Sequence, residues 1–171
     1  MRRILWVILL DIRDLFRYNW YCRRKFLKSM AEIPWETVTE SCGASFDSIR
    51  DIFVHSLQSE HSWIRRLAGK STEGIYETAF SKFASVKDMH DYAYMVESET
   101  NDYLNTLTNE KLESIFEYRG RNGKTHRYKV EDVLMHLVEE EIHHRGELLC
   151  IFWQHDIQPP YTSYTAYKEE A

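Results

Sequence analysis

The chain has 171 residues, of which 43% are hydrophobic and 29% are charged, with six glycines and three prolines. This length and composition predict one globular domain, residues 1–171, with little material for long irregular loops. The 22 basic and 27 acidic residues give a formal net charge of −5, which argues against nucleic-acid binding because an acidic chain is repelled by phosphates.

The first ten residues, MRRILWVILL, place two basic residues before an apolar run, as a signal peptide does. Acids follow at once without a small-residue cleavage site, and the run is much shorter than the roughly 20 apolar residues that span a bilayer. We interpret it as an extra helical turn or a misassigned start. The cysteines Cys22, Cys42 and Cys150 form no C-x-x-C pair, which indicates a reducing, cytoplasmic setting. Because the apolar run is too short to span a bilayer, no membrane contact is expected.

Helical spacing of apolar residues predicts two helices in the first part of the chain. The first covers residues 11–30 and ends before Pro34. The second covers residues 45–67, and Gly69 follows its end. The long connection after it, residues 70–84, predicts a crossover rather than a tight turn. The apolar stripe of the second helix consists of Phe46, Ile49, Phe53, Leu57 and Ile64.

The second half contains two more predicted helices and a change of period between them. Ser85 with Asp88 three residues on resembles a capping box and opens a helix that ends near residue 107. Apolar residues then alternate around Asn122-Gly123, which predicts a two-stranded hairpin. The last helix begins near residue 131 and ends at about 152 or 153, before a tail at 154–171. The predicted fold is all-α, a four-helix bundle with long connections and a small β-hairpin before the last helix.

The last predicted helix carries metal-ligand spacing. His136, Glu140 and His144 are four residues apart, so they form a row on one helix face. Imidazole and carboxylate groups suit a divalent ion such as zinc or nickel, and three protein ligands with an open position are typical of a catalytic site. The remaining ligand must come from another helix, where the candidates are His55, His61 and His90.

A run of acids facing water is the alternative interpretation of this segment. A helical wheel drawn at about 100° per residue places Glu141 and His144 inside the apolar arc and Glu140 at its margin. His136 and His143 fall on the polar side. Buried acids and histidines are costly unless they are paired or bind a metal, so Glu141 and His144 need partners that solvent does not supply.

The pair Glu141 and His144 also has the Glu-x-x-His spacing of carboxylate-bridged di-iron bundles. Such a site requires a second copy of the motif and further inward-facing glutamates. Apart from the overlapping pair Glu140 and His143 in the same segment, the chain contains no other Glu-x-x-His, which makes a di-iron site the minor alternative.

Three segments of the chain, in the same order, resemble the DinB family of small metal-binding four-helix bundles. Residues 15–27, LFRYNWYCRRKFL, resemble the first helix of the family with its Tyr-Asn pair. Residues 52–64, IFVHSLQSEHSWI, resemble its second-helix motif of a histidine, an acid five residues on and a tryptophan eight residues on. Residues 135–148, MHLVEEEIHHRGEL, resemble its His-x-x-x-His motif followed by Arg-Gly and Gln or Glu.

This resemblance implies a divalent metal held by His55, Glu140 and His144. The family usually has histidine where this chain has Glu140, so the implied site has two imidazoles and one carboxylate. Such a triad suits zinc, as in His₂Glu hydrolases, or non-haem iron in a facial arrangement. Zinc or nickel is the expected metal, with iron or manganese as alternatives.

The function implied by the resemblance is that of a metal-dependent hydrolase or a thiol-dependent transferase acting on a small molecule, with a low-molecular-weight thiol as a candidate substrate. Glu141 or Glu147 would orient a ligand, and His143 would act as acid or base. The alternative is a non-catalytic metal-binding or stress-response module, expected to be a homodimer. The tail tyrosines suit such an interface or belong to a frayed terminus; they are Tyr161, Tyr164 and Tyr167.

Overall fold

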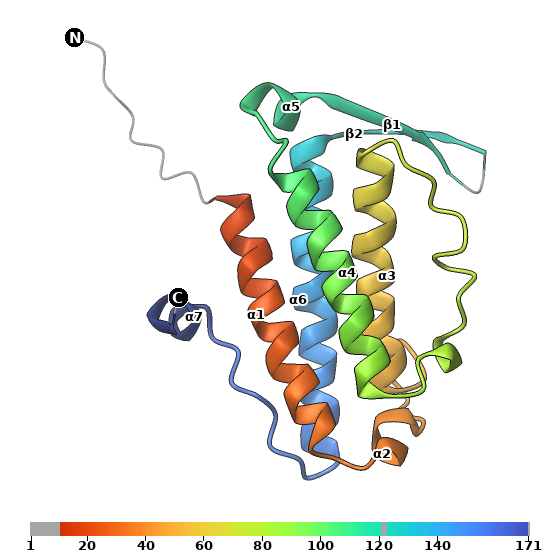
Figure 1. Cartoon of the computed structure of the whole chain (residues 1–171), viewed down its shortest axis with the longest axis vertical. Coiled ribbons are helices and arrows are strands. Elements are labelled where there is room, and N and C mark those ends of the chain that lie inside the picture. Colours follow the sequence, from red (N-terminus) through yellow and green to blue (C-terminus); the bar gives the residue numbers. More distant parts are fainter. Residues whose placement is uncertain (1–10, 121–122, 171) are drawn as a thin grey trace.

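Four long helices lie side by side in the computed structural model of the chain (Figure 1), which describes residues 11–120 and 123–170. The predicted all-α bundle is confirmed. The apolar start of the chain and Asn122 of the predicted turn lie outside the described residues. Within those residues, no helix has the length and apolar character needed to cross a membrane. The long helices are α1 (Ile12–Ala31), α3 (Ile49–Leu67), α4 (Val86–Leu104) and α6 (Val130–Gln154).

The connections make the bundle asymmetric. Helices α1 and α6 run in one direction and α3 and α4 in the other, so the segment between α3 and α4 returns along the length of the bundle (Figure 1). This confirms the predicted crossover. Shorter helices occupy the connections and were not predicted: α2 (Trp35–Thr39), the 3₁₀ turn η1 (Phe80–Lys82) and α5 (Asn109–Glu113).

Side-chain caps set where the helices begin. The Ser85 side chain accepts a hydrogen bond from the backbone N–H of Asp88, as predicted. Helix α3 begins later than predicted because Ser48 caps it in the same way, through the N–H of Asp51. Residues 45–48 therefore belong to an irregular loop, and Phe46 is part of that loop instead of the helix.

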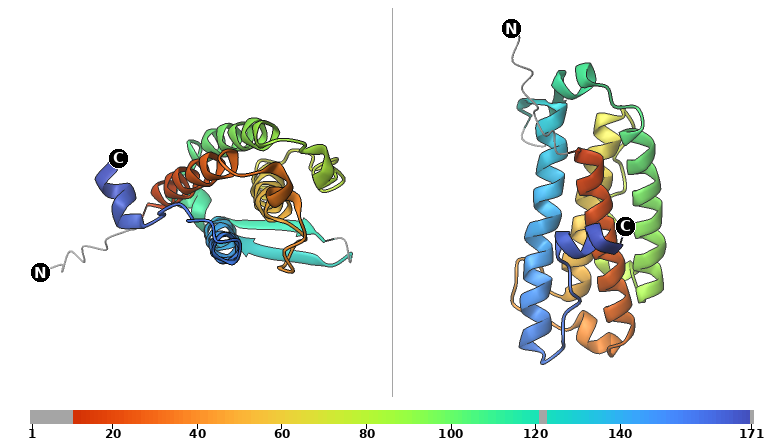
Figure 2. Two further views of the ribbon diagram at one scale, coloured as in Figure 1. Left: turned by 90° about the horizontal axis from the view of Figure 1, so that it is seen from below. Right: turned by 90° about the vertical axis from the view of Figure 1, so that its left-hand side faces the viewer.

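The hairpin was predicted from its turn residues. Strand β1 (Ile115–Arg119) pairs antiparallel with β2 (Thr125–Lys129), with Tyr118 opposite His126. Gly123 has a φ of 75°, a conformation that glycine adopts at little cost in such a turn. The hairpin lies beside α3 and α6 (Figure 2) and leads directly into α6.

Two apolar clusters fill the bundle, and a polar layer separates them. One cluster includes Phe26, Leu57 and Phe152, and the other includes Trp20, Ile64 and Leu134. The layer between them centres on three buried charges, one each on α1, α3 and α6. They are Arg23, Glu60 and Glu141.

Arg23 pairs with both glutamates of this layer. Its Nη2 lies 2.7 Å from Glu60 Oε2 and 2.9 Å from Glu141 Oε2. Trp20 and Thr100 donate hydrogen bonds to the other oxygen of Glu60. Burial lowers the pKa of Arg23, but the neighbouring carboxylates of Glu141 and Glu60 more than compensate and raise it, so the guanidinium stays charged.

The tail forms a seventh helix, α7 (Tyr164–Glu170), packed against α1 on the side away from the hairpin (Figure 2). Tyr164 and Tyr167 donate hydrogen bonds to the Asp14 carboxylate over 2.6 and 3.1 Å, and Lys168 pairs with it at 2.9 Å. Two of the three tail tyrosines thus contact their own chain, whereas Tyr161 is exposed. The interpretation of the tail as a frayed terminus is therefore wrong for α7.

Candidate metal centre

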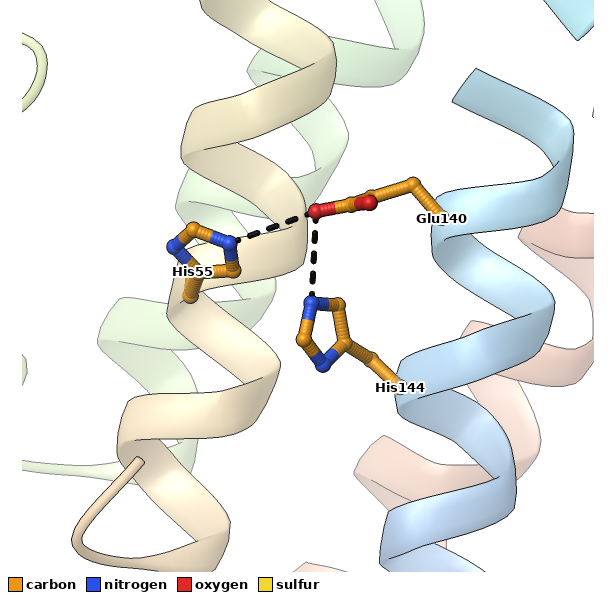
Figure 3. Close-up of side chains that lie close together, drawn as sticks. All are labelled: His55, Glu140 and His144. Atoms are coloured by element: carbon orange, nitrogen blue, oxygen red, sulfur yellow. Dashed lines mark hydrogen bonds and ion pairs between the residues drawn. The ribbon is translucent and has the colours of Figure 1, made fainter. Parts of the chain in front are cut away.

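Helices α3 and α6 bring His55, Glu140 and His144 together (Figure 3). Nε2 of His55 lies 3.4 Å from Oε1 of Glu140, and Nε2 of His144 lies 3.3 Å from the same oxygen. One nitrogen or oxygen from each side chain falls within 4.8 Å of the others. Glu140 and His144 are one helical turn apart on α6, so the packing of α3 against α6 assembles the group.

The spacing of these atoms fits a metal ion. Zinc bonds of about 2.0–2.1 Å at tetrahedral angles place neighbouring ligand atoms about 3.3–3.4 Å apart. The two nitrogen–oxygen distances of 3.4 and 3.3 Å match that separation. Two imidazoles and one carboxylate are also a donor set that zinc accepts while keeping a fourth position. The residues present therefore fit a divalent ion.

Glu147 orients His144 from the side opposite Glu140. Nδ1 of His144 lies 2.7 Å from Oε2 of Glu147, which also accepts a hydrogen bond from the Ser45 hydroxyl over 2.8 Å. Burial raises the pKa of Glu147, but the hydrogen bonds from His144 and Ser45 outweigh it and lower the pKa. A carboxylate on Nδ1 keeps the proton there and leaves the Nε2 lone pair for a metal.

Phe46 covers the group from the loop before α3. Its ring stacks on His55 with centroids 4.0 Å apart and meets His144 edge-on at 5.8 Å. Burial and the neighbouring His144 lower the pKa of His55, against the opposing effect of Glu140. A neutral imidazole is the form that binds metal.

His143, the predicted acid or base, and Glu141, a predicted orienting group, lie in different surroundings. His143 is exposed on α6, and its ring centroid is 5.0 Å from that of His144. Glu141 is buried against Arg23 in the polar layer. Among the described residues, Glu141 belongs to no group with metal-ligand spacing, so the di-iron arrangement is not assembled. Of the two glutamates predicted to orient a ligand, Glu147 is the one that contacts His144.

His61 and His90 lie apart from the triad, whereas His136 adjoins it through Glu140. His61 contacts the Tyr92 hydroxyl at 3.0 Å and faces Glu99, while His90 is exposed beside Asp91. His136 lies one turn from Glu140 and pairs with Glu139. Of the three histidines outside α6 that the sequence left open, the structure places His55 next to Glu140 and His144.

Two motifs at opposite ends of the chain contact each other. Arg145, next to His144, is buried and donates hydrogen bonds to Asn19 Oδ1 over 3.0 Å and to the Tyr18 hydroxyl over 3.3 Å. The Tyr-Asn pair of α1 therefore holds the Arg-Gly segment of α6 and fixes the rotation of that helix. This rotation directs Glu140 and His144 toward α3.

Sequence reasoning missed Ser45 and Phe46 as parts of the site, because both were assigned to the second helix. A signal was present: Ser48 and Asp51 repeat the spacing of Ser85 and Asp88, which places the helix start after Phe46. The contacts of Ser45 and Phe46 with α6 join residues about a hundred positions apart and have no local sequence signature.

Solved structures share this fold. A DinB-like protein from Bacillus cereus ATCC 10987 matches with a TM-score of 0.69 at 17% identity, over 89% of this chain and 95% of that chain. A DinB-like protein from Bacillus subtilis matches with 0.63 at 16%, over 88% and 98%. A conserved protein from Enterococcus faecalis matches with 0.61 at 14%, over 85% and 94%.

The family follows from the sequence itself. No curated protein matches the chain. The sequence model of the DinB family, however, matches residues 8–171, which includes all four long helices, the hairpin and the three residues of the candidate metal centre. The chain belongs to the DinB family.

Proposed function

We propose that this protein is a divalent-metal-dependent enzyme whose metal is held by His55, Glu140 and His144. The observation that carries the proposal is the convergence of two imidazole nitrogens and one carboxylate oxygen from two helices within 4.8 Å. Zinc or nickel is the proposed ion, and iron and manganese also accept these ligands. The free cysteines Cys22, Cys42 and Cys150 are consistent with a cytoplasmic location.

The proposed reaction is hydrolysis of a small molecule or transfer of a low-molecular-weight thiol to an electrophile. A bound divalent ion would supply Lewis-acid activation of the water, thiol or carbonyl group. Glu147 holds the proton on Nδ1 of His144 and so presents Nε2. Phe46 shields His55 from water. His143, exposed beside His144, would exchange a proton between the reacting group and solvent.

Zinc titration by calorimetry tests the metal centre. The wild-type protein is expected to bind about one equivalent of zinc, and His55→Ala and His144→Ala to lose that binding. His136→Ala is the matched control, because His136 lies on the same helix but is exposed and outside the triad. Zinc binding that survives both ligand variants, or that His136→Ala abolishes, would refute the site.

Turnover separates an enzyme from a non-catalytic module. Zinc-loaded protein is tested for hydrolysis of an activated ester and for conjugation of a small thiol to a chlorinated aromatic electrophile. The enzyme proposal expects a rate that needs zinc and falls at least about tenfold in His143→Ala, the proposed acid–base group. Fully zinc-loaded protein that accelerates neither reaction would favour the non-catalytic alternative.

A homodimer is proposed from one exposed face of α6. Met135, Ile142 and Trp153 are exposed there and share one face, because they are spaced by close to whole numbers of helical turns. Exposed apolar residues aligned in this way favour contact with a second copy. Sedimentation is expected to give a dimer that Trp153→Ser weakens, whereas a wild-type monomer at high concentration would exclude it.

A further inference from the structure

A pocket of about 290 Å³ lies beside the candidate metal centre. It is bounded by residues of three elements, α3, β2 and the first turns of α6. The residues that line it are Trp63, Tyr128, Asp132, Val133 and His136. The hairpin supplies Tyr128, so the side of the pocket that Tyr128 forms exists only because β2 lies across α3 and α6.

The pocket adjoins the metal ligands through α6. His136 lines the pocket, and one of its ring nitrogens lies within 4.8 Å of carboxylate oxygens of Glu139 and Glu140. Glu140 in turn contacts His55 and His144. On α3, Trp63 is eight residues, or about two helical turns, beyond His55. The pocket and the triad therefore lie along the same strip between α3 and α6.

The walls of the pocket are aromatic and held in place. Trp63 meets His136 edge-on with centroids 6.1 Å apart and Tyr118 at 5.1 Å. Arg66 covers one face of Trp63 at 5.2 Å. Tyr128 continues a row of rings along the hairpin with Tyr118. These contacts fix the aromatic surfaces before any ligand arrives, which lowers the entropic cost of binding a flat molecule.

One acid gives the pocket its charge preference. Among the described residues that line it, Asp132 alone is a carboxylate and none is lysine or arginine; the Arg66 guanidinium lies over the Trp63 ring at 5.2 Å. Glu139 and Glu140 lie on the adjoining turn of α6. Aromatic faces next to carboxylates attract cations and hydrogen-bond donors and disfavour anions.

We propose that this pocket binds the flat, amine-bearing end of the substrate and so sets the substrate class as a small aromatic or heteroaromatic amine whose other end reaches the metal centre. This inference rests on the proposed function. An aromatic amine fits the pocket because its ring can stack on the aromatic walls and its amine can pair with Asp132. Trp63, Tyr128 and Asp132 are then specificity-determining residues.

The test uses two probes of similar shape and opposite charge, tryptamine and indole-3-propionate. Each is titrated into the full-length protein, metal-free and zinc-loaded, and followed by two-dimensional amide and indole N–H NMR. Tryptamine is expected to shift the Trp63 indole resonance and neighbouring amides of α6, and to bind about tenfold more tightly than indole-3-propionate, a difference of about 1.4 kcal/mol.

Variants assign the binding to this pocket. Tyr128→Ala is expected to weaken tryptamine binding about tenfold, and Asp132→Asn to remove the preference for tryptamine over indole-3-propionate. Glu131→Gln is the matched control, since it removes an equal charge from the same turn of α6 outside the pocket. Tyr161→Ala controls for loss of an exposed tyrosine.

The pocket and the metal centre can fail separately. Absence of tryptamine binding, equal binding of both probes, or variants that bind as the wild type does would overturn the pocket assignment even when zinc binds normally. If the wild-type protein binds no zinc but binds tryptamine as expected, the proposed function is refuted and the pocket assignment is supported. Zinc affinity itself is expected to be unchanged in Tyr128→Ala and Asp132→Asn.

Discussion

At the scale of single residues, the site depends on which atom of His144 faces the metal position. The hydrogen bond of 2.7 Å from Nδ1 to Glu147 selects the tautomer, and Ser45 holds Glu147 in place. Carboxylates that orient a ligating histidine typically contribute tenfold or more to metal affinity. Glu140 differs from them because its carboxylate is itself one of the three converging donors.

We predict that Glu147→Ala weakens zinc binding by about 10–100-fold without abolishing it, because the three ligands remain but His144 loses its orienting partner. Calorimetric zinc titration measures the effect. Glu139→Ala is the control, since that acid is on the same helix, is exposed and pairs with His136 instead of His144. Equal zinc affinity in the wild type and Glu147→Ala would show that the tautomer is set by other means.

The helical wheel predicted part of this residue-level picture. It placed His144 and Glu141 in the buried arc and Glu140 at its margin, and the structure agrees. It did not identify their partners, because Arg23 is 118 positions from Glu141 and periodicity carries no information about such pairs. His55 entered through the family resemblance, as its partly exposed position gave no reason to prefer it over His61.

At the scale of the helices, the charged layer ties α1, α3 and α6 together at one level of the bundle. Two carboxylates share a single guanidinium there, and Nε and Nη1 of Arg23 have no hydrogen-bond partner among the described residues. Removing the shared cation leaves two buried negative charges facing each other. The layer therefore makes the helix packing that builds the metal centre dependent on one residue.

We predict that Arg23→Met lowers the free energy of unfolding by about 3–5 kcal/mol, as is typical when one partner of a buried ion pair is removed. Arg24→Met, which breaks the exposed pair with Glu97, should cost less than about 1 kcal/mol. Urea denaturation measures both. Similar losses in the two variants would mean that the buried layer contributes no more than a surface pair.

Docking of α7 is predicted to depend on pH through Asp14. Hydrogen bonds from Tyr164 and Lys168 lower the pKa of Asp14 below its ordinary 3.8. A lowered pKa in the folded state means that this contribution is fully present above pH 3.8 and is lost as the pH falls through the lower folded value.

Hydrogen exchange of the α7 amides measures this docking. At neutral pH, Asp14→Asn should reduce protection of α7, since the charge on the acceptor is gone. Below the folded pKa the wild type and the variant should converge, because both then carry a neutral side chain. Equal protection of α7 at neutral pH would contradict the role assigned to Asp14.

At the scale of the whole molecule, the strong periodic patterns were predictive and the short elements were not. Four amphipathic helices, the crossover and the Asn-Gly hairpin followed from the sequence. Helices α2, α5 and α7 have seven residues or fewer, too few turns for a hydrophobic period to stand out. Helix α7 is held by contacts with α1 at the other end of the chain, through Asp14 and through the rings of Tyr18 and Tyr21, which no local pattern reports.

The most direct measurement is diffraction from zinc-soaked crystals on both sides of the zinc absorption edge. One strong anomalous peak is expected about 2.0–2.2 Å from donor atoms of His55, Glu140 and His144. A peak held instead by His143 and Glu147, or by His136 and Glu139, would refute the proposed ligand set. So would crystals that take up no zinc at all.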